Sequence, residues 1–103
     1  MADDSEDLVN LTIRKMRKDD IDVVVDIWYN ASIQAHSFIP KNYWKENKNL
    51  MKYKYLPKSD VYLAVKGIVI LGFIALVNDT LAAIFVEPKL QGKGVGSVLL
   101  DYV

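Results

Sequence analysis

The sequence predicts an α+β (mixed α/β) fold, with a central, mostly antiparallel sheet and helices on both faces, in the order β-α-α-β-β-β-α. Three observations predict it. Apolar and polar residues alternate over residues 8–15, an apolar stripe at helical spacing follows, and three short apolar runs joined by short turns fill residues 60–86. Short connections make neighbouring strands antiparallel, so these runs are expected to form adjacent hairpins.

The first two elements are a strand and a helix. Leu8 to Lys15 alternates with period two, which is typical of a half-buried strand. In the following segment, residues 18–38, we expect one helix that begins at an Asp19 cap. Its expected buried stripe is Ile21, Val24, Val25, Trp28, Ala31 and Ala35.

A second helix is predicted over residues 41–56. Pro40 suits its first turn and Pro57 ends it. Its expected core-facing residues are Trp44, Leu50, Met51 and Tyr55.

The second half of the chain predicts three strands and a last helix. The middle run is apolar on both faces, which indicates helices on both sides of the sheet. Asp79 and Thr80 are expected in a hairpin turn, and Pro88 stops the third strand. The last helix is expected from Gly96 to the final residue, with inward positions Val98, Leu99, Tyr102 and Val103.

Length and composition indicate one domain. The chain has 103 residues, of which 51% are apolar and 25% charged. Residues 1–8 hold four acids and no base and are expected to be a disordered acidic tail, which leaves residues 9–103 as the domain. The formal charge is zero, with 13 basic and 13 acidic residues, so binding to nucleic acid or to an acidic membrane is not expected.

Residue types that are missing narrow the chemistry and the setting. The sequence has no cysteine, which excludes disulfides, thiolate catalysis and cysteine-ligated metals in this chain. No group of His, Asp and Glu has metal-ligand spacing, so no metal is expected. The N-terminus lacks a signal-peptide pattern, and the longest uncharged apolar run, residues 67–77, is too short for a membrane span. We therefore expect a cytoplasmic protein.

Six lysines and a single acid, Glu46, lie between Lys41 and Lys58. One interpretation is a helix side that faces water, and the other is a surface for an anionic ligand. The sequence leaves both open.

The segment Gln91-Gly92-Lys93-Gly94-Val95-Gly96 lies between the last strand and the last helix. Glycines allow the main chain to curl so that N–H groups at a helix start converge, which suits a phosphate or diphosphate. The segment fails the GxxxxGK[ST] phosphate loop, and it runs GxGxG where the dinucleotide fingerprint needs GxGxxG. It fits every defined position of the pattern Q/R-x-x-G-x-G/A.

With its surroundings, this loop resembles that of the GCN5-related N-acetyltransferases, and in particular the small bacterial lysine or amine acetyltransferases. The resemblance runs from about Leu11 to the end of the chain, through the stretches TIRKMRKDD, HSFIPKNYW and LAAIFVEPKLQGKGVGSVLLDYV. It implies a partial N-acetyltransferase domain that lacks the family's final strands and helix. That helix usually carries a tyrosine acid, and Tyr102 lies in the wrong helix to replace it.

The resemblance implies that acetyl-CoA is the co-substrate. The main chain of Ile84, Phe85 and Val86 would pair with the pantetheine arm, and an N–H near Val86 would polarise the thioester carbonyl. Gln91 would brace the loop and Lys93 would reach a phosphate. The diphosphate would lie on the main-chain amides of Gly92, Lys93, Gly94, Val95, Gly96 and Ser97.

The general acid and base cannot be assigned from the sequence. His36 is either a packed residue at a helix end or a base, and Glu87 is either a surface residue or a group near the thioester. Phe38 and Tyr43 are candidates for the mouth of an acceptor pocket.

The sequence therefore predicts transfer of an acetyl group from acetyl-CoA to a primary amine, on a protein lysine, an N-terminus or a small molecule, by direct attack. The alternatives are a truncated, non-catalytic remnant that binds CoA or only self-associates, and a different nucleotide binder. Because the sequence ends inside a helix, we expect a truncated domain. LAAIFV would then be an unpaired apolar edge that favours homo-oligomers.

Overall fold

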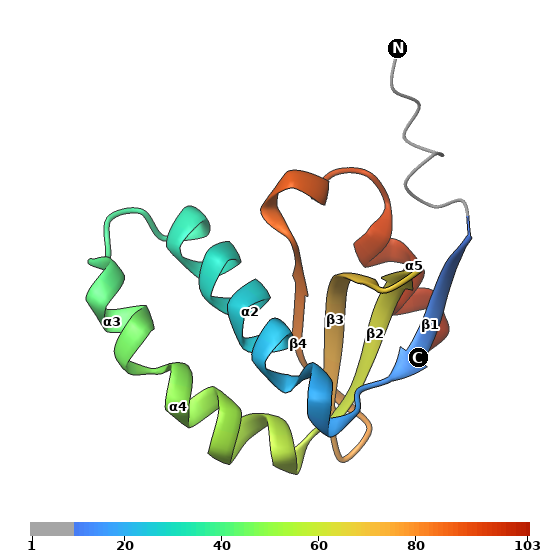
Figure 1. The fold of residues 1–103 in the computed structure, drawn as a ribbon, viewed down its shortest axis with the longest axis horizontal. Coiled ribbons are helices and arrows are strands. Elements are labelled where there is room, and N and C mark those ends of the chain that lie inside the picture. Colours follow the sequence, from blue (N-terminus) through green and yellow to red (C-terminus); the bar gives the residue numbers. More distant parts are fainter. Residues whose placement is uncertain (1–9) are drawn as a thin grey trace.

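A single four-stranded sheet forms the centre of the computed structural model, which describes residues 10–103 (Figure 1). Its strands are β1 (Leu11–Lys15), β2 (Asp60–Lys66), β3 (Val69–Val77) and β4 (Thr80–Val86). All neighbours are antiparallel, in the order β1-β2-β3-β4, so the predicted sheet is confirmed. The predicted start of the first strand, at Leu8, lies outside the described residues.

Helices cover both faces of the sheet, as predicted. The long helix α2 (Ile21–Ala35) lies on one face, and α5 (Val95–Tyr102) lies on the other (Figure 1). Between α2 and β2 the chain forms α3 (Lys41–Glu46), α4 (Lys48–Leu50), the π-helical turn η2 (Met51–Tyr55) and the 3₁₀ turn η3 (Leu56–Lys58). Two further 3₁₀ turns are η1 (Lys18–Asp20) and η4 (Pro88–Leu90). None of the helices within residues 10–103 combines the length and the apolar character that crossing a membrane requires.

Each face of the sheet has its own apolar core. Alternate residues of a strand point to opposite faces, so the strands contribute to both. The core under α2 contains Val24, Val25, Ile27, Trp28, Leu56, Val61, Leu63, Val65, Phe73 and Ala75. The core under α5 contains Ala64, Leu71, Ile74, Val95 and Leu99. The double-sided burial of β3 explains why its sequence is a continuous apolar run.

Some predicted inward positions of the two outer helices are wrong. In α2, Ala35 is exposed, whereas Ile27 is buried. In α5, the buried pair is Val95 and Leu99, four residues apart, because the helix begins one residue earlier than expected. The predicted inward positions Tyr102 and Val103 are 54% and 49% exposed.

The second helix is not continuous. It breaks at Asn47, whose Nδ2 donates to the carbonyl oxygen of Tyr43 at 2.6 Å. The π-helical turn that follows has a wider helical repeat, so the inward face rotates. Leu56 is therefore buried at 2% exposure, while the predicted core residues Leu50 and Tyr55 are 43% and 50% exposed.

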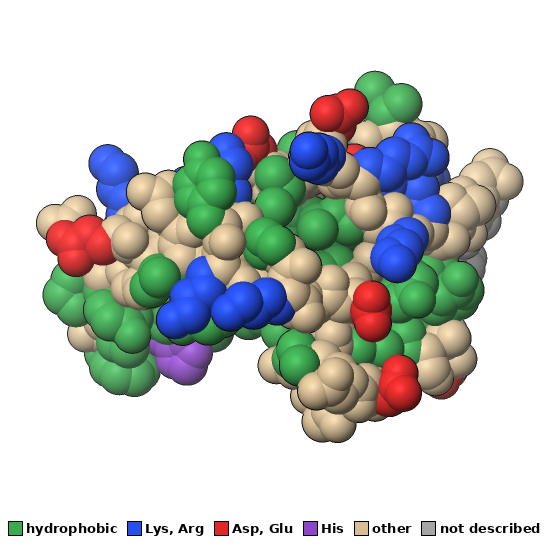
Figure 2. All heavy atoms as spheres, turned by 90° about the horizontal axis from the view of Figure 1, so that it is seen from below, with side chains coloured by type: hydrophobic (Ala, Val, Ile, Leu, Met, Phe, Trp, Pro, Cys, Tyr) green, Lys and Arg blue, Asp and Glu red, His purple; other side chains and the backbone are tan. Residues whose placement is uncertain are grey.

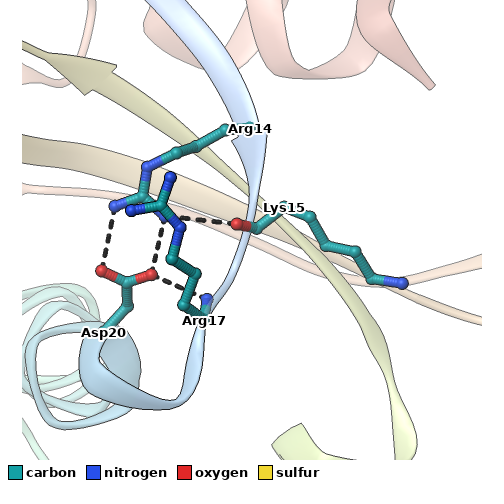
Figure 3. A network of polar contacts seen from close by, with 4 residues as sticks. All are labelled: Arg14, Lys15, Arg17 and Asp20. Atoms are coloured by element: carbon teal, nitrogen blue, oxygen red, sulfur yellow. Dashed lines mark hydrogen bonds and ion pairs between the residues drawn. The ribbon is translucent and has the colours of Figure 1, made fainter.

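The start of α2 is held by Asp20 and not by the predicted Asp19. Arg14 donates two hydrogen bonds to the Asp20 carboxylate, at 2.7 and 2.9 Å, and the main-chain N–H of Arg17 donates a third at 2.7 Å (Figure 3). These contacts join β1 to the first turn before α2. The hydrogen bonds from Arg14 hold the pKa of Asp20 below its ordinary value.

Asp20→Asn is expected to lower the free energy of unfolding by about 1–3 kcal/mol at neutral pH, because the Arg14 guanidinium loses a charged acceptor at a site where the Asp20 side chain is 12% exposed. A carboxyl with a depressed folded pKa stabilises the fold above its unfolded pKa, near 3.9, and loses that contribution as the pH falls through the folded value. Urea unfolding of both proteins at pH 7 and pH 3 tests this. The difference in the free energy of unfolding between the two proteins should be smaller at pH 3 than at pH 7. The same difference at both pH values would contradict this role of Asp20. Asp19→Asn is the control and should change little.

Candidate functional site

The edge strand β4 presents main-chain groups outward at Ile84 and Val86. The N–H of Glu87 donates to the carbonyl oxygen of Leu71 at 2.9 Å, so Glu87 faces β3. In an antiparallel pair the inward and outward peptide groups alternate, so Phe85 also faces β3, whereas Ile84 and Val86 face away. Of the three residues predicted to pair with a ligand, only Ile84 and Val86 therefore have outward peptide groups.

The glycine loop after β4 turns the chain into α5. Gly92 and Gly94 have φ values of 80° and 94°, in the left-handed region that favours glycine. The first helical N–H with a partner in this turn is that of Val98, which donates to the carbonyl oxygen of Gly94 at 3.1 Å. The N–H groups of residues 95–97 precede it and have no acceptor within the helix, so this end carries partial positive charge.

A hollow of about 410 Å³ lies beside this loop. Its lining comprises Val86, Leu90, Gln91, Gly92, Gly94, Gly96 and Ser97. The loop therefore curls around open space and does not run in an extended or buried path.

Gln91 fixes the loop to the strand. Its side-chain Nε2 donates to the carbonyl oxygen of Val86 at 3.1 Å. The predicted brace is thus present in the structure, and it uses an outward carbonyl at the end of β4.

A second hollow, of about 340 Å³, continues from the loop toward α2. Ala31 and Ala35 of α2 line it on one side, and Ile84, Phe85 and Val86 line it on the other. Val86, Gln91 and Gly96 line both hollows, so the two adjoin each other. Sequence reasoning missed the role of Ala31 and Ala35, although two small residues four apart on one helical face were a signal for a groove.

Two loop residues take different positions from the glycines. Val95 is 1% exposed and its side chain packs in the core under α5, so only its main chain faces the loop. Lys93 is half-buried within the loop.

The candidate base His36 and the acceptor candidates Phe38 and Tyr43 belong to one aromatic cluster around Trp44, and none of them lines either hollow. His36 ends α2 and stacks on Trp44, with ring centroids 5.5 Å apart, and it meets Phe38 edge-on at 6.0 Å. Phe38 and Tyr43 are 81% and 53% exposed. Glu87 precedes η4 and lies at the glycine-loop end of β4. Within residues 10–103, no group of three or more His, Asp or Glu could hold a metal ion.

An edge strand with outward peptide groups, a glycine loop at a helix start and the hollows beside them offer room for an extended ligand with an anionic end. The chain is 29% identical over 92 residues to the peptidyl-lysine N-acetyltransferase YiaC of Escherichia coli K12, covering 88% of this chain and 63% of YiaC. No family model matches the chain.

Solved structures agree with this similarity. The solution structure of apo-form YjaB from Escherichia coli has a TM-score of 0.76 and 29% identity, and the match covers 89% of this chain and 63% of YjaB. The crystal structure of the PaiA N-acetyltransferase from Thermoplasma acidophilum in complex with coenzyme A has a TM-score of 0.79 and 18% identity, covering 89% of this chain and 68% of that one.

These similarities confirm the resemblance to the GCN5-related N-acetyltransferases, and they confirm the fold class. The chain spans 63% of the length of the curated relatives it matches.

Proposed function

We propose that this chain binds acetyl-CoA in the groove between α2, β4 and the glycine loop, and that it takes part in acetyl transfer to a primary amine. The observation that carries the proposal is the pair of adjoining hollows that lie along the outward edge of β4 and beside the start of α5. The names of the relatives, peptidyl-lysine N-acetyltransferases, support a protein lysine as the acceptor. The coenzyme A complex of PaiA supports the ligand.

Each part of the groove suits one part of the co-substrate. The main-chain amides of Gly92–Ser97 suit the diphosphate, because the N–H groups of residues 95–97 have no acceptor within α5 and the start of this helix carries partial positive charge. The outward N–H and C=O groups of Ile84 and the outward N–H of Val86 suit the amide groups of the pantetheine arm, which would add to the sheet as an extra strand, while the Val86 carbonyl accepts from Gln91. Ala31 and Ala35 leave room for that arm beneath α2.

The proposed reaction is a direct transfer. The neutral amine nitrogen attacks the thioester carbonyl, and an outward main-chain N–H near Val86 stabilises the negative charge on the oxygen. The C–S bond then breaks, the amine nitrogen loses its proton, and the CoA thiolate takes up a proton. With no cysteine in the chain, no thiol here can carry the acetyl group.

The two candidate bases differ in their surroundings. His36 is held in an aromatic cluster with Trp44 and Phe38, and its main-chain N–H donates to the carbonyl oxygen of Ser32. Glu87 directly follows Val86 at the end of β4 and precedes η4, and it lines neither hollow. A water chain is therefore proposed as the route for the amine proton, and the pH–rate profiles of His36→Ala and Glu87→Gln should keep the wild-type shape.

Two experiments test the function. Acetyl-CoA and CoA should raise the melting temperature, because a ligand at a hundredfold excess over its Kd stabilises the folded state by about 2.7 kcal/mol. ATP should not. Free thiol and an acetylated product should then appear with a lysine peptide. Stabilisation without thiol release would favour the non-catalytic CoA-binding alternative, and stabilisation by ATP alone would favour another nucleotide binder.

Self-association through β4 is a further prediction for this chain. β4 lies at one edge of the described sheet, and Leu81 near its start is 47% exposed. An exposed apolar edge can pair with the same edge of a second copy. Sedimentation should show dimers that dissociate when CoA is added, since both would use the outward groups of Ile84 and Val86. A monomer at every concentration would contradict this prediction.

A further inference from the structure

A groove outside the proposed cofactor site combines basic and apolar side chains. It has a volume of about 430 Å³ and lies where the end of β1 meets η2 and η3. Arg17, Lys18 and Lys52 contribute positive charge, and Met16, Ile21 and Leu56 contribute apolar surface. We call this the basic groove.

None of the residues that line the basic groove is acidic. Of two nearby carboxylates, Asp20 accepts from Arg14, and Asp22 pairs at 2.7 Å with Lys52, one of the cations of the groove, so Arg17 and Lys18 supply its net positive charge. Arg17 and Lys18 are both exposed, so their charges face solvent at the groove. The groove is therefore positive over an apolar floor.

The wider surface has the same sign. Residues 10–103 carry all 13 basic residues of the chain and nine of its 13 acids. The face seen in Figure 2 shows blue basic side chains next to green apolar ones, with some red acidic side chains among them. A net positive surface attracts an anionic partner and repels a polycation. A free polyamine is therefore a poor match to this face.

The basic groove adjoins an apolar cavity that leads to β4. This cavity has a volume of about 370 Å³, and Phe73, Ala75 and Ala83 line it toward the sheet. Leu56 and Ser59 line both the cavity and the basic groove. An extended peptide in the basic groove would therefore continue beside the start of β4, the strand that carries the proposed thioester site.

We propose that the acceptor is a lysine in a protein segment that also carries acidic residues and an apolar side chain, and that this segment docks in the basic groove. This inference rests on the proposed function for its lysine. The acids face Arg17 and Lys18, and the apolar side chain packs on Met16, Ile21 and Leu56.

Peptide binding tests the docking without any acetyl transfer. Three fluorescent peptides of equal length would carry acidic, neutral or basic residues around an apolar residue, with norleucine replacing the reactive lysine. Anisotropy titrations would use the full chain as wild type, as Arg17→Glu/Lys18→Glu, and as Lys41→Glu/Lys45→Glu. The second pair reverses the same charge at exposed positions on α3 and is the matched control.

The acidic peptide should bind the wild type most tightly, and less tightly as salt is raised. Arg17→Glu/Lys18→Glu should weaken it about five- to twentyfold, while Lys41→Glu/Lys45→Glu should change it less than about twofold. Both variants should keep the wild-type melting temperature and CoA affinity, because the exchanged side chains are exposed and do not line the cofactor groove.

Four results would overturn the proposal. The first is that the acidic and neutral peptides bind equally well, and the second is that the control pair loses as much affinity for the acidic peptide as Arg17→Glu/Lys18→Glu. The third is that the acidic peptide binds only after the acidic segment 2–8 is deleted. The fourth is that single-stranded RNA binds more tightly and displaces the peptide. If the chain does not bind CoA, the proposed function is wrong, and the peptide titrations still decide whether the basic groove binds an acidic segment.

Discussion

Gly92→Ala is expected to weaken CoA binding by about five- to thirtyfold. Gly92 has a φ of 80°, and an alanine in the left-handed region costs about 1–2 kcal/mol. If the loop relaxes to relieve this strain, its N–H groups no longer converge on the ligand. The strain energy is then lost from the binding free energy, in which about 1.4 kcal/mol corresponds to a tenfold change in Kd. Isothermal titration with CoA measures it.

Gly67→Ala is the matched control. Gly67 has a φ of 62°, and a β-carbon at either Gly67 or Gly92 would meet no atom within 4 Å. Gly67 lies in the turn between β2 and β3, away from the glycine loop. The Gly67→Ala variant should lose about as much folding stability as Gly92→Ala but keep the wild-type affinity for CoA. An equal loss of CoA affinity in both variants would contradict the assignment of the ligand to the loop.

Gly72→Ala is expected to lower the free energy of unfolding by about 1–3 kcal/mol, the usual cost of overpacking a core. A β-carbon at Gly72 would lie 2.7 Å from the carbonyl oxygen of Phe85 and 3.2 Å from the Cα of Val86. Both atoms belong to the main chain of β4, so the edge strand must move away from β3. CoA binding should weaken as well, because the outward groups of Ile84 and Val86 move with the strand.

Gly96→Ala should have the opposite effect on the unliganded protein. Its β-carbon would meet side-chain atoms of Val86 and Ile84 at 3.8 and 3.9 Å, which is ordinary contact. Within α5, replacing glycine by alanine favours the helix by up to about 1 kcal/mol. Urea unfolding of the two variants should therefore give shifts of opposite sign. Destabilisation of both would show that the close approach at Gly72 is not what matters.

Local patterns predicted much of the fold. The three strands of residues 60–86 and their turns follow from short-range signals. In the last hairpin Asn78 and Asp79 take positive φ, whereas Thr80, which was predicted in the turn, begins β4 and pairs with Val77. The glycine loop was equally visible, because its conformation depends on its own residues. Gln91 was identified through the family pattern, and its hydrogen bond to Val86 bears out the expected geometry.

Features that depend on tertiary packing could not be predicted from the sequence. The switch from Asp19 to Asp20 requires Arg14 on β1 to reach the helix start. The buried position of Leu56 follows from a π-helical turn that no local propensity indicates. The outward direction of Ile84 and Val86 depends on the register with β3.

The basic groove was only partly visible in the sequence. For the lysine-rich segment, the sequence did not decide between a helix side that faces water and a surface for an anionic ligand. In the structure, Lys48 and Lys52 pair with Asp26 and Asp22 of α2, whereas Lys52 also lines the groove with Arg17 and Lys18. Arg17 and Lys18 lie far from Lys52 in the sequence, so only the fold brings these charges together.

The central claim is that the main-chain amides of the glycine loop bind the diphosphate of CoA. Titrating the ¹⁵N-labelled chain with CoA and following its amide resonances tests this most directly. The account predicts saturable shifts that are largest at residues 92–97 and extend to Ile84 and Val86. A titration that moves none of these resonances, or only those of other segments, would contradict it.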